Sequence, residues 1–193
     1  MNLEQELLRL PRHKQIELLA LIEEEKKREN RRQFYTWFPD KGDLRRELYP
    51  RHMQFFEAGI EHDERCFMAG NRTGKTIAAG YEITAHMTGE YPHWWRGKIF
   101  NHGIRALAAG DTGATTRDII QQKLIGPYDD IGTGMIPGDL IVDLVPKRGL
   151  PNAYEEIHVR HVPTSGVSKL KLRSYDQGRR IFQGTEEDLV LVR

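Results

Sequence analysis

Hydrophobic residues recur along the chain with two periods, and each period predicts one type of secondary structure. Apolar residues at helical spacing predict helices, whereas alternation with period two or a short apolar run predicts strands. Helices are expected over residues 2–10, 12–32, 76–87 and 115–124, and strands over residues 66–69, 104–109, 156–162, 168–175 and 188–192. From Arg65 onward, strands and helices alternate, which is typical of parallel strands joined by crossover helices. The pattern therefore predicts an α/β fold with a mostly parallel sheet flanked by helices.

The first 33 residues are predicted to form a helical arm ahead of the main domain. Asn2 and Gln5 make a helix-capping pattern, and Pro11 separates the first helix from the second. Two interpretations stay open for this arm: a helical hairpin packed on the main body, or a docking arm for a partner protein. Aromatic and turn residues follow it, which indicates a linker over residues 34–47 and a main domain over residues 48–193.

Composition and charge are those of a polar globular chain whose positive and negative residues nearly balance. A length of 193 residues suffices for one domain with an appendage, because domains cluster near ~100–150 residues. The chain has 29 Lys and Arg residues against 28 Asp and Glu residues, so any contact with nucleic acid must come from a local patch. Its apolar runs are too short to span a bilayer and no export signal is visible, which predicts no membrane partner. The single cysteine, Cys66, excludes an internal disulfide and fits a reducing cytoplasm.

The most informative stretch lies between an apolar run and a helical pattern, and it has the spacing of a Walker A phosphate-binding loop. It consists of Ala69, Gly70, Asn71, Arg72, Thr73, Gly74, Lys75 and Thr76, with Ala69 in place of the first glycine. Small residues let backbone N–H groups turn toward phosphate oxygens, and the following helix directs its positive end at the same charge. Lys75 is expected to reach the β- and γ-phosphates of ATP, and the Thr76 hydroxyl to ligate Mg²⁺. The alternative is a glycine turn with a solvated lysine.

Catalytic groups are harder to place than the loop. Arg72 either senses the γ-phosphate and stabilises the transferred charge, or lies in solvent. Asp111 and Asp143 each follow a predicted strand, but neither is followed by the second acid that ATP hydrolysis requires, and both can simply cap or terminate those strands. The predicted strand over residues 188–192 is followed only by Arg193. No catalytic carboxylate is therefore visible.

The loop and several further stretches occur in a familiar order. With them, the chain resembles the large terminase subunits of tailed bacteriophages. These stretches are residues 64–76, Thr88 to Gly97, Gly110-Asp111-Thr112 with Thr116-Arg117-Asp118, Gly132 to Gly138, Ser174 to Arg180, and Phe182 to Thr185. The resemblance covers most of the chain after about Leu48. So many matches in one order are more specific than the phosphate loop alone.

This resemblance implies the ATPase portion of a motor that packages viral DNA into proheads, with ATP and Mg²⁺ as cofactors. It also implies double-stranded DNA, a small terminase subunit, a portal protein and further copies of the chain as partners, in the host cytoplasm. In the family, the strand after Phe182 leads into an Asp-Glu-Glu-Pro segment that carries the catalytic acids, whereas here Val192 is followed by Arg193. A C-terminal nuclease domain also belongs to the family and is missing here. The resemblance thus predicts a P-loop NTPase fold incomplete at its C-terminus, with little turnover.

Three further residue groups have two interpretations each. Some terminases recognise adenine with a glutamine before the first core strand, a role that Gln54 can serve unless His52 occupies that position. The basic stretch from Lys169 to Arg180 either contacts DNA or a neighbouring subunit's ATP, with Arg179 as the catalytic candidate, or is an exposed strand face. Trp94 and Trp95 are expected to pack in the core rather than stack on bases.

Two alternatives to the packaging ATPase follow from the same residues. The first is a truncated prophage remnant that binds nucleotide or a partner without hydrolysis. The second is an unrelated P-loop kinase, which would transfer phosphate to a small acceptor without stimulation by DNA.

Overall fold

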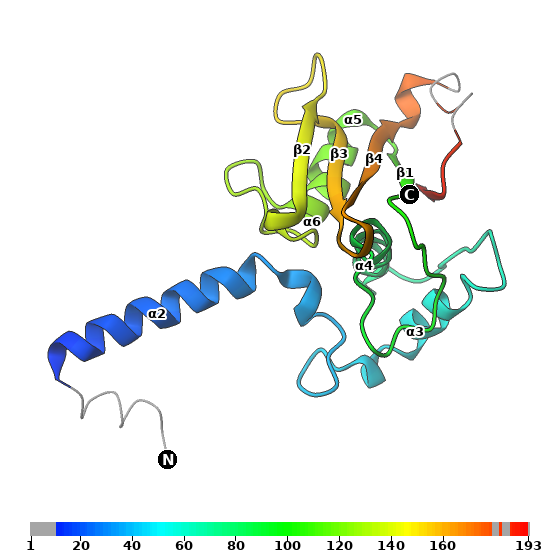
Figure 1. Ribbon diagram of the computed structural model, residues 1–193. Coiled ribbons are helices and arrows are strands. Elements are labelled where there is room, and N and C mark those ends of the chain that lie inside the picture. The colour runs from blue at the N-terminus through cyan, green and yellow to red at the C-terminus, as the bar shows by residue number, and fades with distance from the viewer. Residues whose placement is uncertain (1–10, 179–181, 183–185, 193) are drawn as a thin grey trace.

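A computed structural model of the chain describes residues 11–178, 182 and 186–192 (Figure 1). Its α-helices are α2 (Arg12–Asn30), α3 (Pro50–Glu57), α4 (Lys75–Thr88), α5 (Gly113–Thr115) and α6 (Gln122–Ile125). Its strands are β1 (Arg105–Gly110), β2 (Ile141–Pro146), β3 (Tyr154–His161), β4 (Gly166–Ser174) and β5 (Leu189–Val192). A π-helical segment, Thr116–Gln121, joins α5 to α6, so one continuous helix follows β1. The helix and strand types predicted over 12–32, 76–87, 104–109, 115–124, 156–162, 168–175 and 188–192 are confirmed.

Helix α2 projects from the body as an arm (Figure 1). It begins directly after Pro11, as expected because proline is tolerated where a helix starts. Two ion pairs fasten the chain just beyond its end to the body, Arg31 to Asp130 at 3.6 Å and Arg32 to Asp139 at 2.8 Å. The helix predicted over residues 2–10 lies outside the described residues. In the part of the chain that the structure describes, no helix is both long and apolar enough to cross a membrane.

The five strands form one mixed sheet in the order β2-β3-β4-β1-β5. Strand β1 pairs in parallel with β4 and β5, whereas β2 with β3 and β3 with β4 are antiparallel. The expectation of a mostly parallel sheet is therefore wrong. The physical reason is connection length: the turn from His161 to Gly166 is too short for the crossover that parallel neighbours require.

One side of this sheet and the helices behind it form the main core. Ile157, Leu170 and Ala108 point from three strands toward Ile83 of α4 and Leu124 of α6. On β4, buried Leu170 and Leu172 alternate with exposed Lys169 and with half-buried Lys171 and Arg173, so the predicted alternation is confirmed but only Lys169 is fully exposed. Two of these basic side chains are paired, Lys171 with Glu187 at 2.8 Å and Arg173 with Glu155 at 2.9 Å.

A second core, built from aromatic side chains, lies between α3 and α4. Phe56 and Tyr81 come from these helices, and Phe34 and Phe38 come from the stretch expected to be a linker. All four are at most 2% exposed. Trp95 is 8% exposed and lies 5.1 Å from Phe56 between ring centroids, which confirms that this tryptophan packs in the core.

Two local predictions fail in the described structure. The run expected to be a strand over residues 66–69 is extended but pairs with no strand. Its Phe67 instead stacks on Phe55 of α3 at 5.0 Å, and Met68 is 85% exposed, so side-chain packing on α3 takes the place of sheet pairing. Asp143 lies within β2 opposite His158 rather than at the end of a strand, because β2 continues to Pro146.

Gly89 ends α4 at a position that an alanine cannot occupy without strain. Its φ is 70°, and its N–H donates to the Ala85 carbonyl at 2.9 Å. A Cβ at Gly89 would overlap Nε2 of the buried His161. We expect Gly89→Ala to lower the free energy of unfolding by about 2–4 kcal/mol, because left-handed strain adds to the displacement of His161. Urea denaturation measures this loss.

Gly149 provides the matched control for this substitution. Its φ is also positive, at 78°, but a Cβ there would meet nothing within 4 Å. Gly149→Ala is therefore expected to show only the cost of the left-handed backbone, about 1–2 kcal/mol. Equal losses in the two variants would contradict the steric contribution of His161.

Candidate nucleotide-binding site

The phosphate loop, Ala69 to Thr76, connects the segment 64–68 to the first turn of α4. Two residues in it have left-handed backbone conformations: Arg72 at a φ of 61° and Gly74 at a φ of 85°. The second of these makes Gly74 the residue that directs the chain into the helix, which begins at Lys75. Glycine reaches this conformation without the steric cost that a side chain brings. The local sequence therefore explains how the loop turns back over the start of the helix.

Backbone N–H groups of the loop are left open to an anion. In the described part of the chain, the N–H groups from Asn71 to Thr76 donate to no protein acceptor. Those of Lys75 and Thr76 belong to the first turn of α4, whose N–H groups have no partner within the helix. Because these donors gather at the positive end of a helix, they form a surface suited to phosphate oxygens.

Lys75 lies across the loop rather than pointing into solvent. Its Nζ donates to the carbonyl oxygens of Ala69 at 2.5 Å and of Gly70 at 2.6 Å. A third bond, from the Thr73 hydroxyl to the Gly70 carbonyl at 2.9 Å, closes the same turn. The ammonium group is thus held at the loop by neutral acceptors, which a negatively charged phosphate oxygen can replace with a stronger, charge-assisted bond.

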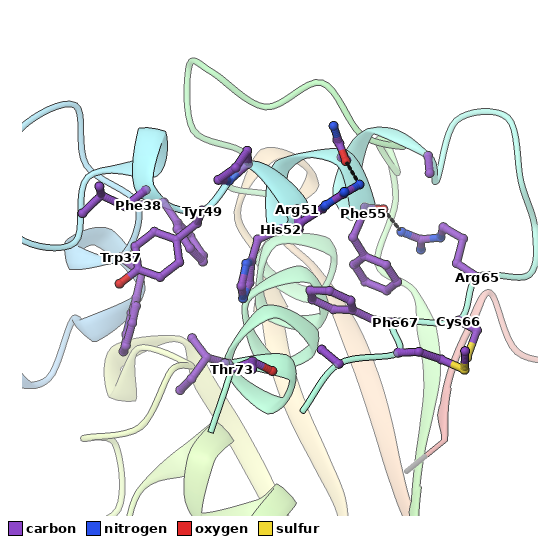
Figure 2. A pocket seen from close by; sticks show the side chains of 18 of the residues that line it. Trp37, Phe38, Tyr49, Arg51, His52, Phe55, Arg65, Cys66, Phe67 and Thr73 are labelled. Carbon is purple, nitrogen blue, oxygen red and sulfur yellow. Dashed lines mark hydrogen bonds between the residues drawn. The ribbon is translucent and has the colours of Figure 1, made fainter. Parts of the chain in front are cut away.

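A cavity of about 1390 Å³ adjoins the loop (Figure 2). Ala69, Arg72, Thr73 and Gly74 of the loop line one part of it, and the rest combines aromatic, aliphatic and charged side chains. Its aromatic walls come from Trp37, Phe38, Tyr49, Phe55 and Phe67. A phosphate-binding surface beside an aromatic cavity matches the two chemically different ends of a nucleotide. The residues present therefore fit ATP, and Thr76, the predicted Mg²⁺ ligand, is the second residue of α4.

The two candidates for base recognition, His52 and Gln54, differ in what they contact. Gln54 is exposed, and its Oε1 accepts from Arg51 Nη1 at 3.2 Å. His52 is only 7% exposed, and its Nε2 lies directly against Gly74 of the loop. Burial lowers the pKa of His52 below its usual range and outweighs the nearby backbone of Thr73 and Gly74, which raises it. The imidazole is therefore neutral near pH 7.

The remaining predicted site residues are placed as follows. Arg72 is exposed and lines the cavity, whereas Arg179 lies outside the described residues. Asp111 follows β1, as predicted, and its carbonyl accepts from the Asp176 N–H at 3.2 Å. Asp143 faces His158 at 3.6 Å. Neither carboxylate is bonded to a residue of the phosphate loop in the described part of the chain.

A buried polar network behind the loop was missed by sequence reasoning. Arg65, which precedes the loop, forms a 2.9 Å ion pair with Glu82 of α4, and the two side chains are 15% and 5% exposed. His86 Nε2 lies 3.6 Å from the same carboxylate oxygen, and its Nδ1 lies 3.0 Å from the Tyr91 hydroxyl. Charged residues at helical spacing within an apolar pattern, such as Glu82 and His86, are the signal that was available.

The comparisons with known proteins agree with the resemblance seen in the sequence. The large terminase subunit of Salmonella phage P22 is 32% identical over 203 aligned residues, which cover 95% of this chain and 39% of that protein. The chain thus spans about two fifths of the length of this relative. No protein-family model and no solved structure matches the chain. The chain belongs to the large terminase subunits of tailed bacteriophages and corresponds to the N-terminal portion of such a subunit.

Proposed function

We propose that the chain binds Mg–ATP at the phosphate loop and is the ATPase portion of a motor that packages viral DNA into proheads. The observation that carries this proposal is the loop itself: open N–H groups at the start of α4, with Lys75 beside them. The adjoining aromatic cavity supports a nucleoside triphosphate over a free phosphate, because it offers stacking surface next to the phosphate donors.

Each loop residue has a distinct role in this proposal. The N–H groups from Gly70 to Thr76 hold phosphate oxygens, and Lys75 exchanges its carbonyl partners for the β- and γ-phosphates. The Thr76 hydroxyl holds Mg²⁺, which neutralises phosphate charge when bound. Arg72 lines the cavity and is the candidate for contact with the γ-phosphate, and Arg179 remains a candidate for transition-state stabilisation.

The partners follow from family membership. In this proposal the chain acts in the host cytoplasm with double-stranded viral DNA, a small terminase subunit and a portal protein. It works as a homo-oligomer within the complete motor. A remnant that binds nucleotide without hydrolysis is the alternative, and a measurement of phosphate release distinguishes the two.

Nucleotide titration tests the proposal directly. Isothermal calorimetry in Mg²⁺ should show ATP binding at least tenfold more tightly than AMP, because the loop contacts the phosphates that AMP lacks. Equal affinities for ATP and AMP would mean that only the aromatic cavity binds, and no binding by either nucleotide would overturn the proposal. A phosphate-release rate above background that disappears in Lys75→Ala would exclude the inert remnant.

A further inference from the structure

His52 lies between the aromatic cavity and the phosphate loop (Figure 2). It comes from α3, and its ring packs edge to face on Phe67 at 5.1 Å and on Tyr49 at 5.4 Å between centroids. Phe38, only 1% exposed, lies 5.9 Å away on the side of the second core. These contacts leave the imidazole little freedom to rotate, so its position is set by the walls of the cavity.

The other side of the ring contacts the turn that precedes Lys75. A Cβ placed on Gly74 would lie 3.0 Å from His52 Nε2, so the imidazole sits directly against this left-handed residue. The backbone of Thr73 and Gly74 lies close enough to the imidazole to raise its pKa, against the larger effect of burial. A single side chain therefore contacts both the cavity walls and the part of the loop whose conformation determines where the N–H groups point.

We propose that His52 is a positioning residue that holds Thr73 and Gly74 of the loop and transmits the filling of the aromatic cavity to phosphate binding. A base that stacks in the cavity restricts Tyr49 and Phe67, and through them the imidazole between these rings and the loop. A loop that is already ordered loses less entropy when it binds phosphate. Base and phosphate binding are then coupled, and the coupling acts equally in both directions. This inference rests on the proposed nucleotide site.

The coupling between base binding and phosphate binding is measured with two separate ligands, adenosine for the base and tripolyphosphate for the phosphates. Tripolyphosphate is titrated with and without saturating adenosine, and adenosine with and without tripolyphosphate, all in Mg²⁺. In the native chain we expect each to strengthen binding of the other about fivefold, at the lower end of typical coupling between sites. His52→Phe keeps an aromatic ring but loses the polar Nε2 that lies against Gly74. We expect it to weaken tripolyphosphate binding about three- to tenfold and to abolish the coupling.

A second substitution of His52, by a polar side chain, distinguishes a positioning role from a contribution to packing alone. His52→Gln places a polar amide where the imidazole nitrogen meets the loop, so it should recover part of the affinity and of the coupling that His52→Phe loses. His13→Phe, at an exposed histidine of α2, is the control for the substitution itself and should bind as the native chain does. If His52→Phe does not fold, the pair His52→Gln and His52→Met decides the question, because these side chains have similar length and differ in the amide.

The outcomes distinguish this inference from the function on which it rests. If the native chain binds neither tripolyphosphate nor ATP, the proposed function fails and the role of His52 fails with it. If the native chain binds both, and His52→Phe shows unchanged affinity and unchanged coupling, only the role of His52 is overturned. Native binding of tripolyphosphate that adenosine does not strengthen would likewise overturn the transmission from cavity to loop.

Discussion

Lys75→Ala is expected to weaken Mg–ATP binding by about 100-fold or more. The ammonium group has two loop carbonyls as partners in the present structure, Ala69 and Gly70, and would exchange them for two phosphate groups. Each charge-assisted bond contributes about 1.5–3 kcal/mol, and a loss of about 3 kcal/mol corresponds to more than a hundredfold in affinity. Calorimetric titration with ATP measures the change.

The stability of this variant should remain close to that of the native chain. Lys75 bonds only to the backbone of its own loop, so its removal leaves no buried charge without a partner. Lys75→Arg is the matched variant: it keeps the charge but presents a planar, longer group, and should recover only part of the affinity. Unchanged ATP binding in Lys75→Ala would mean that the stretch is a glycine turn with no phosphate-binding role.

Most elements around the site could be predicted because their evidence is local. Helix α4 carries its own start signal in Gly74 and its own stop signal in Gly89, and both glycines are left-handed in the structure. Strand β4 alternates basic and apolar residues, so one face had to be buried and the other exposed. The predicted phosphate loop rests on equally local evidence, because its spacing is read from eight consecutive residues.

Strand direction and sheet partners could not be predicted in the same way. A period of two is the same in a parallel and an antiparallel strand, so the alternation within β3 does not give its direction; only the short connection to β4 shows that β4 runs opposite to it. The extended run before the loop was expected in the sheet because it is apolar. Its Phe67 packs on α3 instead, and sequence pattern does not distinguish these two ways of burying a ring.

The contacts that organise the site join residues far apart in sequence. His52 touches Gly74, and Arg65 pairs with Glu82 across the whole phosphate loop. Neither pair follows from the periodicity of either segment, because each depends on how α3 and α4 pack. A motif therefore predicts the phosphate-binding residues, whereas the side chains that pack against the motif become visible only in three dimensions.

Glu82→Ala is expected to lower the free energy of unfolding by about 3–5 kcal/mol, because it leaves the Arg65 guanidinium inside the protein without its carboxylate. The Arg65 Nη1 atom also donates to the Phe55 carbonyl at 2.7 Å, and its guanidinium carbon lies 4.6 Å from the centroid of the Phe55 ring. These contacts hold the arginine in place, so it cannot easily turn to solvent when Glu82 is removed. Urea denaturation of the two chains measures the loss.

The second effect of Glu82→Ala should appear at the phosphate loop. Arg65 precedes the loop and Glu82 lies in the helix that follows it, so their 2.9 Å ion pair fixes the distance between the two ends. Loss of the pair should therefore weaken ATP binding even under conditions where the variant is fully folded. Arg65→Met combined with Glu82→Leu removes both charges together and should be markedly more stable than Glu82→Ala, since no buried charge remains unpaired. A double variant as unstable as Glu82→Ala would show that packing around this site, and not the ion pair, supplies the stability.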